Sequence, residues 1–127
     1  LFNKGLNLRD YTYIDDIVES IKRMITGIDG LKPISETDQF QATRSPYYHI
    51  FNIGGNNPVP VLEFVETLEA ALGKPAIKEM VAFQPGDVFS TQADTTTLES
   101  FINFKPSVSL KAGLEKFVTW YKNYHNF

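Results

Sequence analysis

The sequence predicts a small α+β fold, with about four helices, a few short strands and a single domain over residues 1–127. Its 127 residues are 43% hydrophobic and 21% charged, which is ordinary composition for a globular domain with one core. Helix-like and strand-like segments alternate along the chain. Because three strands at most are indicated, a large parallel sheet is not expected.

The first predicted helix begins near Ile14 and should bury an apolar stripe. Acidic residues in its first turns, Asp15 and Asp16 among them, and basic residues near its end complement the helix dipole. Gly27 is the expected stop. The stripe follows the spacing i, i+3, i+4, i+7, i+11 and consists of Ile14, Ile17, Val18, Ile21 and Ile25.

The middle of the chain predicts a long loop, a strand and a second helix. Residues 28–47 mix Gly, Pro, Ser, Thr and charge without periodicity, which is typical of a loop. The run YYHIFNIGG favours a strand that enters a glycine turn. A helix is expected over residues 61–72, ended by Gly73 and Pro75. Its inward side chains should be Leu62, Val65, Leu68 and Leu72.

The last third of the chain predicts a strand, a turn and two helices. Residues 76–83 are a candidate strand, and the QPGD run at 84–87 has turn composition. Ser109 is a predicted N-cap for the last helix. A short helix from about Asp94 should bury Leu98, Phe101 and Ile102, and in the last helix a common face is formed by Leu110, Leu114, Phe117, Val118 and Tyr121.

Charge and composition argue against several classes of function. Twelve basic and fifteen acidic residues give a net charge of −3 without a basic stripe, so nucleic acid is not an expected partner. The absence of cysteine removes disulfides, thiolate metal sites and cysteine nucleophiles, and it fits a reducing compartment. Apolar runs are too short to span a membrane, and no signal-peptide pattern is present. We therefore expect a cytoplasmic protein without a membrane partner.

The residues alone do not suggest a catalytic centre or a metal site. The two histidines, His49 and His125, lack a nearby carboxylate pattern and are expected to be structural or on the surface. The glycines of NIGGNNP could hold a phosphate, but Pro58 and Pro60 remove amides, so a strand-ending turn is favoured. The glycine fingerprint of a dinucleotide-binding fold is absent. None of the six tyrosines is followed four residues later by lysine.

Two positions look suited to binding. Arg9 lies in an extended lead-in, where its guanidinium could face a phosphate. Asp87 follows a Pro-Gly turn and could accept two hydroxyl protons from a ribose. The structural alternatives are that Arg9 pairs with Asp10 or Asp16 and that Asp87 caps its own turn. The residues by themselves favour neither interpretation.

Four blocks of sequence resemble, in order, the nucleotide-sugar epimerases and dehydratases of the extended short-chain dehydrogenase/reductase family. The blocks are GLNLRDYTYIDDIVESI, YHIFNIGGNNPVPVLEFVETLEAALGK, AFQPGDVFSTQAD and FKPSVSLKAGLEKFVTWYKNY. The resemblance runs from Leu1 to about Tyr124 and is weakest over residues 30–47. The QPGDV form is most similar to UDP-glucuronate 4-epimerases, since galactose-type enzymes more often carry arginine at position 84. UDP-N-acetylhexosamine 4-epimerases come next.

The resemblance implies that this chain is the nucleotide-sugar-binding C-terminal part of a longer enzyme, and Leu1 in place of methionine suggests the same. The parent would be an NAD-dependent 4-epimerase of a UDP-hexuronate or UDP-hexose, acting through a 4-keto intermediate as a homodimer. Its NAD and its Tyr-x-x-x-Lys pair would belong to the missing N-terminal Rossmann half. This part alone would bind no NAD and be catalytically silent.

The same resemblance assigns roles to three residues. Arg9 would contact the diphosphate, and Asp87 would hold the uridine ribose with Gln84 beside it. If a Rossmann half docks on this chain, Arg9, Asp87 and some apolar neighbours should share one exposed face. The alternatives are a free-standing binding or interaction module without catalysis and the same part of a nucleotide-sugar dehydratase or decarboxylase.

Overall fold

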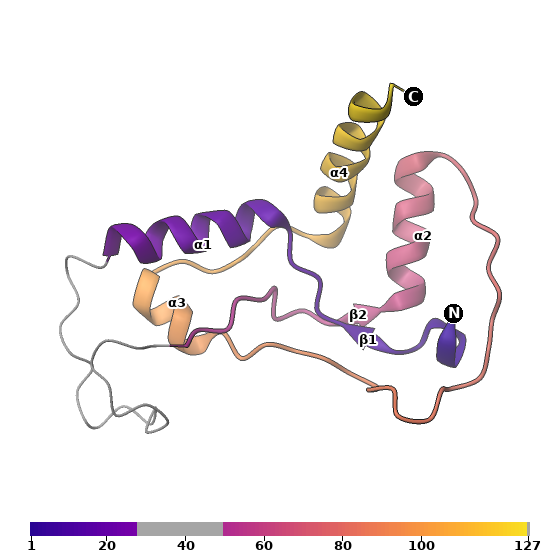
Figure 1. The fold of residues 1–127 in the computed structure, drawn as a ribbon, viewed down its shortest axis with the longest axis horizontal. Coiled ribbons are helices and arrows are strands. Elements are labelled where there is room, and N and C mark those ends of the chain that lie inside the picture. Colours follow the sequence, from indigo (N-terminus) through magenta and orange to yellow (C-terminus); the bar gives the residue numbers. More distant parts are fainter. Residues whose placement is uncertain (28–49, 127) are drawn as a thin grey trace.

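The computed structural model describes residues 1–27 and 50–126, and it has the predicted α+β character (Figure 1). Four α-helices, a short 3-10 turn and a small sheet make up this part of the chain. In order, the elements are η1 (Phe2–Gly5), β1 (Leu8–Arg9), α1 (Ile14–Gly27), β2 (Val59–Pro60), α2 (Val61–Leu72), α3 (Thr96–Ile102) and α4 (Leu110–His125). Within the described ranges, none of the helices has the length and apolarity needed to cross a membrane.

The sheet brings three distant segments together at Leu8. β1 pairs antiparallel with β2, so that Leu8 lies opposite Pro60. On its other side Leu8 forms a parallel bridge with Ser90. There the amide of Leu8 donates to the carbonyl of Phe89 at 2.8 Å, and the amide of Thr91 donates to the carbonyl of Leu8 at 3.2 Å. This arrangement places Arg9 beside the segment that follows the QPGD turn.

The two strands predicted over residues 47–55 and 76–83 are not observed. Residues 50–55 of the first are not a strand, and residues 47–49 lie outside the described part. In the second, Val81 donates to Leu1 and accepts from Lys4 at 3.0 and 3.1 Å, and the carbonyl of Glu79 accepts from the N-terminal amino group of Leu1. A ladder needs a partner that continues alongside, and here the bonds to the first residues of the chain are confined to Glu79 and Val81.

Local signals correctly predict the range of α2 and the start of α4. α2 occupies the predicted range and is followed by Gly73 in the left-handed conformation, at φ 72°. α4 begins after Ser109, whose hydroxyl accepts a hydrogen bond from the amide of Ala112. α3 buries Leu98 and Ile102, while Phe101 is half-buried. The inward residues predicted for α2 are only half-buried, and Phe117 of α4 is exposed.

The helices pack as two pairs, α1 against α3 and α2 against α4 (Figure 1). Over the described residues, the buried hydrophobic side chains are Leu98, Ile102, Leu114 and Val118. The first two belong to α3 and the last two to α4. The core is therefore divided between the pairs.

The apolar stripe predicted to be the buried face of α1 is mostly exposed. Ile17 is half-buried. On the opposite side of the helix, Asp16 and Ser20 are buried at 6% and 0% exposure, because Asp16 binds the amides of the segment before α4. We call the exposed positions the exposed stripe of α1: Ile14, Val18, Ile21 and Ile25, with 57%, 55%, 43% and 64% of each residue exposed.

Candidate nucleotide-binding site

Arg9 and Asp87 form an ion pair at the junction of β1 with the QPGD turn. The Nη2 atom of Arg9 lies 3.0 Å from Oδ1 of Asp87, and the two side chains are 27% and 29% exposed. Nη1 of Arg9 donates to the carbonyls of Leu8 and Val88, at 2.8 Å each. The guanidinium therefore has a fixed orientation, because a charged side chain held by several acceptors keeps little rotational freedom.

The turn that carries Asp87 has the predicted conformation. The amide of Asp87 donates to the carbonyl of Gln84 at 3.1 Å, and Gly86 has φ 89°, a value that suits glycine. The carboxylate of Asp87 also accepts from the amide of Val88 at 2.8 Å. Gln84 is exposed at the rim of the turn.

Of the structural alternatives for Arg9 and Asp87, the one for Asp87 is observed and the one for Arg9 is not. Arg9 pairs with Asp87, whereas Asp10 and Asp16 each accept backbone amides of other segments. Asp87 does cap its own turn through Val88, as the structural alternative predicts. The same carboxylate still holds Arg9, so the capping and ion-pairing roles coexist.

Asn7 joins this site, although sequence reasoning did not single it out. It is 3% exposed, and its Nδ2 donates to Oδ2 of Asp87 at 2.6 Å. Its Oδ1 accepts from Nδ2 of Asn3 at 2.8 Å. An asparagine in a short polar run carries no signal of a partner eighty residues away, and only the fold reveals this contact.

Asp10 lies next to Arg9 in sequence but serves a different part of the structure. Successive residues of an extended chain point to opposite sides. The Asp10 carboxylate accepts from the amides of Asn56 and Asn57 at 3.0 and 3.3 Å, and from the amide of Ala93 at 3.3 Å. The NIGGNNP segment is thus a turn built on a carboxylate, and these amides are not free to hold a phosphate.

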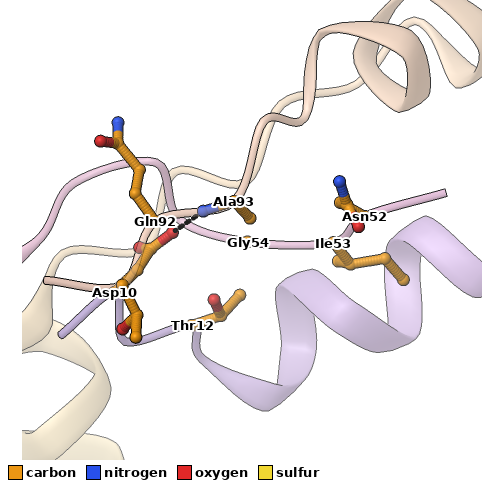
Figure 2. A pocket seen from close by; sticks show the side chains of 8 residues that line it. Asp10, Thr12, Asn52, Ile53, Gly54, Gln92 and Ala93 are labelled. Carbon is orange, nitrogen blue, oxygen red and sulfur yellow. Dashed lines mark hydrogen bonds between the residues drawn. The ribbon is translucent and has the colours of Figure 1, made fainter. Parts of the chain in front are cut away.

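An open pocket of about 330 Å³ borders Asp10 (Figure 2). Figure 2 shows Asp10 and Gln92 at one end, Asn52 and Ile53 at the other, and Thr12 between them. Asn52 donates to the carbonyl of Asp94 at 3.2 Å, so its amide is already engaged. The complete lining consists of Asp10, Thr12, Asn52, Ile53, Gly54, Thr91, Gln92 and Ala93.

Tyr11 connects this region to α2. Its ring stacks on Phe64 with centroids 4.3 Å apart. Burial raises the pKa of the Tyr11 hydroxyl, and the charge of Arg9 opposes that rise. Of the histidines, His49 lies outside the described residues, and His125 is exposed at the end of α4, where its ring meets those of Tyr121 and Tyr124.

Comparison with known proteins bears on the resemblance. No family model matches the chain. It is 41% identical over 131 residues to Protein CapI of Staphylococcus aureus, covering 98% of this chain and 38% of the relative. It is 42% identical over 129 residues to the probable UDP-glucuronate 4-epimerase of Rhizobium meliloti strain 1021, covering 98% and 37%.

A solved structure agrees with these relatives. The UDP-glucuronic acid 4-epimerase of Bacillus cereus, in complex with UDP-glucuronic acid and NAD, is 27% identical and similar in structure with a TM-score of 0.70. The similarity covers 98% of this chain and 35% of that one. The resemblance to UDP-glucuronate 4-epimerases is thus confirmed. This chain spans less than two-fifths of the length of the relatives that it matches.

Proposed function

We propose that this chain is the nucleotide-sugar-binding part of an NAD-dependent 4-epimerase that acts on a UDP-hexuronate or UDP-hexose. The observation that carries the proposal is the meeting of Arg9 and Asp87, 78 residues apart in sequence. One supplies a cation for a diphosphate and the other supplies acceptors for a ribose. The names of the relatives favour a UDP-hexuronate within this class, with the sugar epimerised through a 4-keto intermediate.

The contacts of Arg9 suit a diphosphate. Carbonyls hold its Nη1 atom, while Nη2 faces Asp87 at a partly exposed position. A diphosphate would compete with the carboxylate for the Nη2 donor, since charge-assisted bonds to either anion are strong. Gln84 on the neighbouring turn would offer an uncharged amide beside the nucleotide.

NAD would be held by another part of the parent enzyme. A dinucleotide needs a glycine turn between a parallel strand and a helix. The described residues do not fit one, because their sheet is antiparallel and the amides that follow Gly54 and Gly55 donate to Asp10. We therefore propose that this chain alone is catalytically silent.

The exposed stripe of α1 is where the Rossmann half would pack. Four aliphatic side chains along one helix face are costly to leave in water, and the relatives have more than three-fifths of their length outside the matched region. The site itself has exposed apolar neighbours, Val88 and Phe89, which would be covered together with the bound nucleotide. The missing half would thus complete both the helix packing and the site.

Titration with uridine diphosphate tests this function. The unaltered chain should bind weakly, because its half-built site pays an ordering cost. Arg9→Gln should weaken binding by about tenfold or more, as expected for loss of a charge-assisted bond. Arg23→Gln is the matched control, since Arg23 pairs with Glu19 on α1. Submicromolar affinity of the unaltered chain, or equal binding by both variants, would contradict the proposal.

A further inference from the structure

Asn7 is a buried polar residue whose side chain is attached directly to the proposed site. Over the described residues, the other buried polar side chains are Asp16, Ser20 and Thr95. Ser20 donates to the carbonyl of Asp16 within α1, the Asp16 carboxylate accepts from the segment before α4, and Thr95 donates to Glu99 of α3. Asn7 instead donates to Asp87. The buried side chain of Asn7 therefore fixes the position of the partly exposed Asp87 carboxylate.

We propose that Asn7 is a positioning residue that holds the Asp87 carboxylate for a ribose when a diphosphate draws Arg9 away. This inference rests on the proposed function. In the structure described here, Arg9 contributes one of the three hydrogen bonds to Asp87. A ligand that engages Arg9 would remove that bond and leave the carboxylate with two others.

Asn7 and the amide of Val88 hold one oxygen each of the Asp87 carboxylate. A carboxylate offers about four acceptor positions, two on each oxygen. Oδ1 accepts from Arg9 and from the amide of Val88, at 3.0 and 2.8 Å, and Oδ2 accepts from Asn7 at 2.6 Å. Without Arg9, each oxygen keeps one donor and has one open position. Two open positions on one carboxylate suit the two adjacent hydroxyls of a ribose.

The rotation of the carboxylate depends on Asn7. The terminal torsion of an aspartate is broad, so one hydrogen bond at one oxygen leaves the plane of the carboxylate free to turn. Asn7 fixes the second oxygen, and Asn3 fixes the orientation of the Asn7 amide. Asn3 has φ 47°, a conformation that asparagine and glycine accept more readily than other residues.

The test uses the whole chain with two probes that separate the halves of the site. Uridine contains the ribose without a phosphate, and inorganic pyrophosphate contains the diphosphate without a ribose. With pyrophosphate present to engage Arg9, Asn7→Leu should weaken uridine binding by about tenfold, the usual effect of losing a bond to a charged group, while the binding of pyrophosphate by itself should be unchanged. Asn52→Leu, at an asparagine bonded to Asp94, is the matched control and should alter neither.

A second variant covers the risk that Asn7→Leu does not fold. Asn3→Gly keeps the positive φ and removes only the hydrogen bond that orients the Asn7 side chain. Uridine binding should therefore weaken by less than in Asn7→Leu, and pyrophosphate binding should be unchanged. Equal losses of both probes, or full uridine affinity in Asn3→Gly, would overturn the role of Asn7. If the unaltered chain binds neither probe nor uridine diphosphate, the proposed function fails and this inference with it.

Discussion

At the residue scale, aspartates organise this chain mainly through backbone amides. The acidic residues of the segment RDYTYIDD could have been explained as helix-dipole partners alone. Asp10 and Asp16 instead hold distant segments in place, since a carboxylate can accept several amide hydrogens at once. Asp10 binds Asn56, Asn57 and Ala93, and Asp16 binds Ser107 and Val108.

Removing the Asp16 carboxylate should destabilise the chain far more than removing its neighbour. Asp16→Ala leaves the amides of Ser107 and Val108 without their acceptor, which should cost about 1–3 kcal/mol of unfolding free energy. Asp15→Ala removes only an exposed pair with Lys116, worth about 0–1 kcal/mol. Both changes weaken the helix dipole interaction alike. Urea unfolding of the two variants makes the comparison, and equal losses would count against the anchoring role.

Gly54 should tolerate no side chain, because the Asp10 turn passes close to the segment before α3. A Cβ atom at Gly54 would lie 2.5 Å from Cβ of Ala93 and 3.0 Å from Oδ2 of Asp10. Gly54→Ala should therefore cost about 1–3 kcal/mol of unfolding free energy. Gly73→Asn is the control, since nothing lies within 4 Å there and asparagine accepts its positive φ. Thermal unfolding that ranks the control as the worse variant would refute this packing.

At the scale of elements, local signals predicted helices well and strands poorly. The α2 boundary and the Ser109 cap depend on residues within one turn, so they could be predicted from the sequence. Strand pairing depends on segments far apart, and residues 76–83 bond to the first residues of the chain only through Glu79 and Val81. The periodicity of α1 predicted a helix with an apolar face. It could not indicate which element lies opposite that face.

The segment after α2 should contribute acid-sensitive stability through Glu69. The hydrogen bond from Lys78, with a second from the amide of Ala76, holds the pKa of Glu69 below its usual value. Because the pKa is lower in the folded chain, this stability is complete above the unfolded pKa and is lost as pH falls through the folded pKa. Glu69→Gln should lower the melting temperature at pH 7. As the pH falls, the melting temperature of the variant should decrease by less than that of the unaltered chain.

The measurement is the melting temperature between about pH 7 and pH 3, a range that spans the usual Glu pKa. Glu66→Gln, at an exposed position of the same helix, serves as the control. Parallel profiles for Glu69→Gln and the unaltered chain would show that Glu69 does not make this contribution.

The exposed stripe of α1 should tolerate polar residues without loss of folding. The double variant Val18→Ser and Ile25→Ser changes residues that are 55% and 64% exposed, so unfolding free energy should change by less than about 1 kcal/mol. Binding of an apolar fluorescent dye should fall, because the stripe loses half of its aliphatic groups. Leu114→Ala, at a 7% exposed core residue, should cost about 2–5 kcal/mol. A comparable loss in the double variant would mean that the stripe is packed.

At the scale of the whole molecule, much of the apolar surface of the described residues is exposed to solvent. Four hydrophobic residues are buried over the described residues, while fifteen large hydrophobic ones are exposed. These include the exposed stripe of α1 and the aromatic residues Phe117, Trp120 and Tyr124 along α4. A small divided core and wide apolar surface are expected if, as we propose, this chain packs against the rest of a larger enzyme.

The candidate site could be predicted only in part. Arg9, Gln84 and Asp87 were named from the resemblance and from their suitability for a nucleotide, and the fold brings Arg9 to Asp87. Asn7 was missed because its role depends on a contact with a residue eighty positions away. Ligand contacts at these residues stay a prediction, since local sequence patterns describe turns and helices better than binding.

The most direct test maps uridine diphosphate binding onto the whole chain by nuclear magnetic resonance, through the backbone amide shifts of the labelled protein. We predict weak, saturable shifts concentrated at residues 7–9 and 84–89, which in Arg9→Gln should need about tenfold or more ligand to saturate. Shifts centred on the pocket beside Asp10, or shifts unchanged in Arg9→Gln, would contradict a nucleotide site built on Arg9 and Asp87.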